Sequence, residues 1–144
     1  MKKIIITLSL MVAVLAQSFA TEPGVTASTQ KAFESQFARA KDVSWSQSGE
    51  FVIASFTQYG KKLYAYYNQS SELAVVAEPI TLQALPAEMF VSLVEGHPDY
   101  IVSEVYKMKS DDGVRYHAVI ENAKEKVFVN NSGEGWSITK KTKK

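Results

Sequence analysis

The sequence predicts an α+β protein of two tandem repeats, each a helix followed by a four-stranded antiparallel meander, with the helices packed on one face of the sheet. Three observations lead to this prediction. Apolar residues recur at helical spacing in two short segments. In the stretches that follow, apolar and polar residues alternate with a period of two. Polar turn residues divide those stretches into short strands. A length of 144 residues suits one domain or two small fused repeats.

The first twenty residues have the pattern of a secretory signal peptide. A basic start at 1–3 precedes a nearly unbroken apolar run at 4–16, and Ser18 and Ala20 place small residues before a cleavage point. That run is shorter than the ~20 residues that span a bilayer as a helix. We expect cleavage between Ala20 and Thr21 and no transmembrane segment afterwards, with an uncleaved membrane anchor as the alternative.

The composition of the chain limits the cellular compartments and the kinds of partner that we expect. Losing Lys2 and Lys3 from the 16 basic residues leaves 14 against 15 acidic ones, so the formal charge moves from +1 to about −1. This balance gives no electrostatic case for nucleic-acid binding. Because the chain has no cysteine, it has no disulfides, no thiolate metal site and no lipobox cysteine for lipid attachment. We expect a periplasmic or secreted protein.

The first repeat is expected over about 29–78, after a flexible leader at 21–28. Phe33, Phe37 and Ala40 recur at i, i+4 and i+7, which predicts a helix from Ser28 or Thr29 to about Lys41. Alternation and turn residues predict four strands after it, at 43–46, 51–57, 62–68 and 73–77.

The second repeat is expected over about 85–139. Leu85-Pro86 begins a helix whose apolar stripe includes Phe90 and Leu93, and Gly96-His97-Pro98 ends it. Strands are expected at 100–109, 114–121, 126–130 and 136–139, with a hairpin turn at 111–113. Residues 29–140 thus form the domain, and 141–144 a frayed basic tail that aids solubility or contacts an anionic surface.

A shift of 64 residues supports the repeat. It superposes Gly49 on Gly113, Ala54 on Ala118 and Lys62 on Lys126. The order of the expected elements is also the same in both halves. Edge strands of the two halves can pair into one longer sheet, although the sequence does not decide this.

One face of the sheet is expected to carry uncovered aromatic side chains. Successive side chains of a strand point to opposite faces of the sheet. If Val52, Ala54 and Phe56 face the helix, the residues between and beside them in the sequence face away from it. Exposed aromatic patches mark binding sites, and Tyr is an effective interface anchor. The alternative is structural cover by the strand at 100–109, the basic tail or a second chain. The candidate binding residues are Phe51, Ile53, Tyr64, Tyr66, Arg115, His117 and Phe128.

Other polar residues have ordinary structural explanations. His97 ends a helix, and two distant histidines do not resemble a metal site. Asp111 and Asp112 fit a hairpin turn, without the further oxygens of a calcium loop. No phosphate loop, nucleophile elbow or zinc helix is present. We expect no catalytic residue, no metal and no cofactor.

The chain resembles the PepSY-like family of exported bacterial proteins, which is related in fold to β-lactamase inhibitor protein. The resemblance covers roughly 29–138. It implies an exported α+β protein with a helix-on-sheet repeat, and it carries no catalytic motif. The residues that carry it are Phe33, Phe37, the segment Ala40-Lys41-Asp42-Val43-Ser44-Trp45, the strand from Phe51 to Phe56, Leu85-Pro86, Tyr100-Ile101 and Gly113-Val114-Arg115-Tyr116.

These observations favour a non-enzymatic binding module for a protein, a peptide or an apolar ligand. The alternatives are an inhibitor of a secreted hydrolase, a small periplasmic enzyme and a self-assembling structural protein. The sequence fixes neither the identity of the partner nor the oligomeric state.

Overall fold

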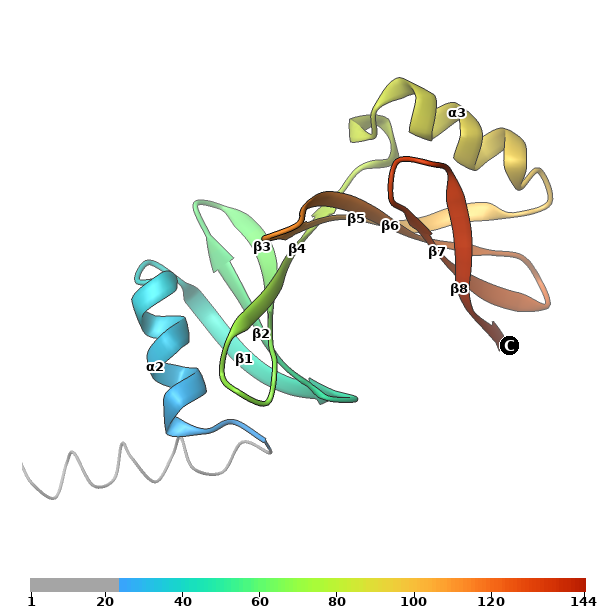
Figure 1. Cartoon of the computed structure of the whole chain (residues 1–144). Helices are drawn as coiled ribbons and strands as arrows, with labels where there is room; N and C mark the ends of the chain where they lie inside the picture. The colour runs from blue at the N-terminus through green and yellow to red at the C-terminus, as the bar shows by residue number, and fades with distance from the viewer. Residues whose placement is uncertain (1–23) are drawn as a thin grey trace, which may run out of the picture.

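The computed structural model describes residues 24–144 and has an α+β fold of two α-helices and one eight-stranded antiparallel sheet (Figure 1). The strands follow one another in the sheet in chain order. The expected signal peptide and its cleavage point lie outside the described residues. The elements are α2 (Ala27–Gln36), β1 (Lys41–Ser48), β2 (Phe51–Gln58), β3 (Lys61–Tyr67), β4 (Leu73–Ile80), the 3-10 helix η1 (Leu82–Ala84), α3 (Ala87–Gly96), β5 (Ile101–Ser110), β6 (Gly113–Glu121), β7 (Glu125–Asn131) and β8 (Trp136–Lys143).

Strands β4 and β5 join the two halves into one sheet, which answers the question that the sequence left open. Their register runs from Val76 opposite Lys109 to Ile80 opposite Val105. Strand β4 therefore extends to Ile80, beyond the end predicted at residue 77, and includes Pro79. Pairing of β3 with β4 stops at Ala77, so Pro79 lies where one side of β4 has no ladder partner. A proline without an N–H is tolerated at such a position.

Helix α2 is shifted toward the N-terminus relative to the predicted helix. Its N-cap is Thr26, whose hydroxyl accepts a hydrogen bond of 3.1 Å from the backbone N–H of Thr29. The leader predicted at 21–28 therefore ends earlier than expected. The helix also ends at Gln36 rather than near Lys41, because Phe37 leaves helical geometry at φ −127° and ψ 55°. Phe37 still packs against the first apolar cluster. Its spacing from Phe33 therefore reflects a shared place in the core, although Phe37 lies outside the helix.

Helix α3 begins after Pro86, which is its N-cap, and ends at Gly96, with His97 as its C-cap. A short 3-10 helix that the sequence pattern did not predict precedes it. The indole N–H of Trp136, at the start of β8, donates a hydrogen bond of 3.0 Å to the carbonyl of Met89. This bond ties the edge strand of the second half to the helix.

Two apolar clusters form the core, one in each half. In the first, the ring of Phe33 on α2 lies 5.0 Å from that of Phe56 and 5.2 Å from that of Trp45. In the second, Leu93 of α3 packs with Val105 and Ile120. The strand registers place both sets of strand residues on the same face of the sheet, here called the helix face. Figure 1 shows both helices on the outer side of an arched sheet.

The C-terminal residues do not form the frayed basic tail that the sequence suggested for 141–144. Strand β8 extends through Lys143, with Thr142 opposite Lys126 and Lys143 opposite Glu125. Pairing along the whole length of β7 requires these residues, since β7 begins at Glu125. A run of lysines can occupy an edge strand because charged side chains there discourage pairing with other chains.

Candidate binding face

The face of the sheet opposite the helices, here called the open face, is built by alternate residues of all eight strands. Ser55 lies opposite Tyr64, which lies opposite Ala77, and Ala77 lies opposite Met108. The register continues across β6 and β7, where Val119 lies opposite Phe128. The open face is therefore continuous from the first half of the chain into the second.

A row of aromatic rings crosses this face. Phe51 lies 6.2 Å from Tyr66 between ring centroids, and Tyr64 lies 6.3 Å from Tyr106. The row continues through His117, whose ring is 6.4 Å from Tyr106 and 6.1 Å from that of Phe128. These separations fall in the range in which aromatic pairs attract one another beyond simple burial.

The middle of the row borders a hollow of about 340 Å³, here called the central hollow. This volume is at the lower end of the range of ligand pockets, roughly 300–1,000 Å³. A second hollow, of about 230 Å³ and bordered by Arg115 and Asn130, shares Met108 with it. The residues that line the central hollow are Tyr66, Ala77, Glu104, Tyr106, Met108, His117, Val119 and Phe128.

The aromatic rings of the open face cover smaller residues but are themselves only partly covered. Val119 is 3% exposed although no helix of residues 24–144 packs on its side of the sheet. Tyr66, Tyr106 and Phe128 stay half-buried. The strand at 100–109 does not cover them, since β5 lies within the sheet and adds Tyr106 to the row. The C-terminal residues likewise lie in the sheet as β8.

Burial raises the pKa of both tyrosines that line the central hollow. The hydroxyl of Tyr106 donates to Glu104 at 2.6 Å. Burial, then this carboxylate, raise the pKa of Tyr106 above its ordinary value. Burial also raises the pKa of Tyr66, with a smaller contribution from Tyr64. Since the ordinary pKa of tyrosine is already about 10, both hydroxyl groups are uncharged at neutral pH.

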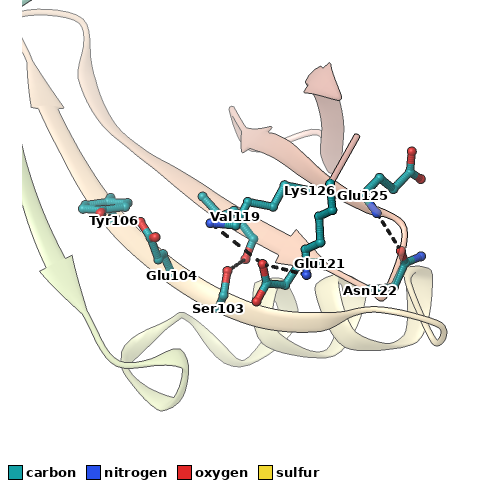
Figure 2. A network of polar contacts seen from close by, with 9 residues as sticks. Ser103, Glu104, Tyr106, Val119, Glu121, Asn122, Glu125 and Lys126 are labelled. Atoms are coloured by element: carbon teal, nitrogen blue, oxygen red, sulfur yellow. Dashed lines mark hydrogen bonds and ion pairs between the residues drawn. The ribbon is translucent and has the colours of Figure 1, made fainter. Parts of the chain in front are cut away.

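Basic side chains lie over two rings of the aromatic row. The ammonium group of Lys62 is 5.8 Å from the centre of the Tyr64 ring, and that of Lys140 is 5.9 Å from the centre of the Phe128 ring. Both are within cation–π range. Farther along the face, Glu121 lies 3.8 Å from Lys126. Figure 2 shows this pair together with Glu104 and Tyr106.

The structure brings most of the candidate residues together. Tyr66, His117 and Phe128 line the central hollow, and Arg115 borders the adjoining one. Tyr64 and Phe51 extend the aromatic row, as described above. Ile53 differs from the rest, because it is only 9% exposed; it lies opposite Tyr66 on the neighbouring strand. It supports the face and offers little surface to a ligand.

Sequence reasoning missed several residues of the central hollow, among them Glu104, Tyr106 and Met108. All three lie on β5, whose alternation is broken by a register shift between Val102 and Glu104. Their even spacing after the shift is the signal that identifies their common face.

The remaining polar candidates occupy structural positions. The Nδ1–H of His97 donates to the carbonyl of Leu93 at 3.0 Å, at the end of α3. Asp111 and Asp112 form the β5–β6 turn, in which Gly113 has φ 119°. His117 contacts Asn130 on the neighbouring strand. Among residues 24–144, no group of three or more metal-ligating side chains is close enough to hold an ion.

Comparison with known proteins identifies the fold. No family model and no curated protein matches the chain. Solved structures do match: a BLIP-like protein of Bacteroides fragilis has a TM-score of 0.62 at 15% identity, covering 82% of this chain and 85% of its own. A protein of Bacteroides eggerthii, provisionally named as periplasmic, has a TM-score of 0.69 at 17% identity, with 83% and 88% covered.

A third match, a protein of Bacteroides ovatus from the family designated DUF2874, has a TM-score of 0.67 at 18% identity, with 85% and 88% covered. At these identities the likeness shows the fold alone, which is BLIP-like. The PepSY-like part of the resemblance stays a prediction. In the part of the chain that the structure describes, no helix has the length and apolarity needed to cross a membrane.

Proposed function

We propose that this chain is an exported, non-enzymatic binding protein that holds a protein, a peptide or an apolar ligand on its open face. The observation that carries the proposal is the half-buried aromatic row around the central hollow. Partly exposed Tyr and Phe side chains on a rigid sheet lose little conformational freedom on binding, and they provide the apolar area of a typical interface centre.

The titratable groups of the central hollow make contacts within the sheet. Glu104 accepts a hydrogen bond from Tyr106, and His117 contacts Asn130. These contacts orient both side chains on the face that the proposal assigns to a partner.

Export belongs to the proposal as well. It is supported by the signal-peptide pattern of the first twenty residues and by the provisional periplasmic name of one structural relative. The identical order of one helix and four strands in each half supports a tandem repeat. The helix of each half would then protect one face, while the other remains free for a partner.

A pull-down from exported extract tests the proposal. Three baits are compared: the wild type, the Tyr64→Ser/Tyr66→Ser variant and a Tyr59→Ser control. Tyr59 is 74% exposed in the β2–β3 turn, away from the aromatic row. The proposal expects a protein that the wild type and the control retain and the folded double variant loses. Equal retention by all three baits contradicts it.

The identity and behaviour of the retained protein separate the narrower alternatives. A secreted hydrolase whose activity falls on binding would make this chain an inhibitor. A second copy of the same chain would indicate self-assembly through the open face.

A further inference from the structure

Basic side chains outnumber acidic ones on the open face. Among the strand residues that the registers place there, the carboxylates are those of Glu104 and Glu121, and the basic side chains are those of Lys41, Lys62, Arg115, Lys126 and Lys140. The whole chain after the expected cleavage has 14 basic and 15 acidic residues. A nearly neutral protein therefore presents a positively charged open face.

The two open-face carboxylates are already engaged. Glu104 accepts the Tyr106 hydroxyl, and Glu121 lies 3.8 Å from Lys126 and 3.4 Å from Lys144. Lys62, Arg115 and Lys140 take part in no ion pair within residues 24–144. These three exposed cations remain available to an anionic partner.

The spacing of the cations excludes a small anion as the common ligand. Lys62 lies on β3 and Lys140 on β8, five strand spacings apart in the sheet. At about 4.8 Å per spacing, the arc between them is roughly 24 Å. An extended segment of about seven residues covers that distance. A single occupant that meets both lysines must therefore extend across the face, as a polypeptide segment can.

We propose that the open face binds an acidic segment of a partner protein. An apolar side chain of the segment enters the central hollow, and flanking carboxylates meet Lys62 on β3, Arg115 on β6 and Lys140 on β8. This inference rests on the proposed function and specifies the chemistry of the partner. Electrostatic complementarity of this kind steers association and selects among partners.

Selection from a displayed library of random twelve-residue peptides tests the inference. The bait is the chain purified from the exported fraction, and the counter-bait is its Tyr66→Ser/Phe128→Ser variant. Peptides retained only by the wild type are expected to carry more Asp and Glu than the input library. Their affinity should fall as salt is raised, because exposed charges are screened.

Charge variants test the same point with the selected synthetic peptides. The Lys62→Gln/Lys140→Gln variant should weaken binding by roughly five- to twentyfold, as two exposed ion pairs are lost. The matched control is Lys107→Gln/Lys109→Gln, which removes the same charge from β5 on the helix face. It should leave the affinity unchanged.

The outcomes separate the inference from the proposed function. Selected peptides that need Tyr66 and Phe128, yet show no acidic excess and ignore the Lys62/Lys140 change, would overturn the inference and leave the binding face standing. Absence of any peptide that distinguishes the wild type from the counter-bait would count against the binding face itself.

Discussion

Truncation of one phenylalanine on each face of β2 should separate the stabilising face from the binding face. Phe56 is 0% exposed on the helix face and contacts Phe33 and Phe37, whereas Phe51 is 38% exposed on the open face and contacts Tyr66. Removing a fully buried Phe side chain costs about 3–5 kcal/mol, because a cavity remains. At Phe51, water can fill the space, and only part of the ~1.5–3 kcal/mol for burying the ring is lost.

We therefore expect Phe56→Ala to lower the free energy of unfolding by about 4 kcal/mol and Phe51→Ala by about 1 kcal/mol. Urea denaturation followed by tryptophan fluorescence measures both, since Trp45 contacts the first cluster and Trp136 the second. Equal losses in the two variants would refute the division into a core face and an open face.

Three further predictions concern hydrogen bonds of the two helices. The hydroxyl of buried Tyr67 donates to Gln36 at 2.7 Å, and burial raises the pKa of Tyr67 to about 12. Because the folded pKa exceeds the unfolded one, its contribution to stability is complete below about pH 10 and is lost as the pH rises toward 12. Denaturation at several pH values should show a shallower alkaline loss in Tyr67→Phe. Trp136→Phe removes the bond to Met89 and should cost about 1 kcal/mol in urea denaturation. Thr26→Ala removes the N-cap of α2 and should also cost about 1 kcal/mol, with no loss in a Thr26→Ser control.

The class of fold and the positions of the strands could be predicted because they depend on local patterns. Alternation along β2 and β6 and the turn residues between strands predicted the eight strands that the structure contains. Ends of elements were less predictable. Phe37 follows the helical spacing of α2 but lies beyond the end of the helix. It keeps this spacing because it packs against the same apolar cluster as Phe33.

Long-range features were harder to predict for a physical reason. Whether β4 pairs with β5 depends on a contact between the halves, and no local pattern encodes it. The same applies to the central hollow, where Tyr106 and Glu104 meet residues of four other strands. The register shift near Ser103 hides the alternation of β5 from sequence reasoning. Residues such as Tyr64 and Phe128 were identified because their strands alternate regularly.

The affinity of the retained partner for three forms of the chain tests the central claim most directly. Isothermal titration of the wild type, the Tyr64→Ser/Tyr66→Ser variant and the Tyr59→Ser control gives the three dissociation constants. We predict a loss of at least ~2 kcal/mol, or about thirtyfold, for the double variant and no change for the control. Wild-type affinity in a correctly folded double variant would contradict the assignment of the open face as the binding site.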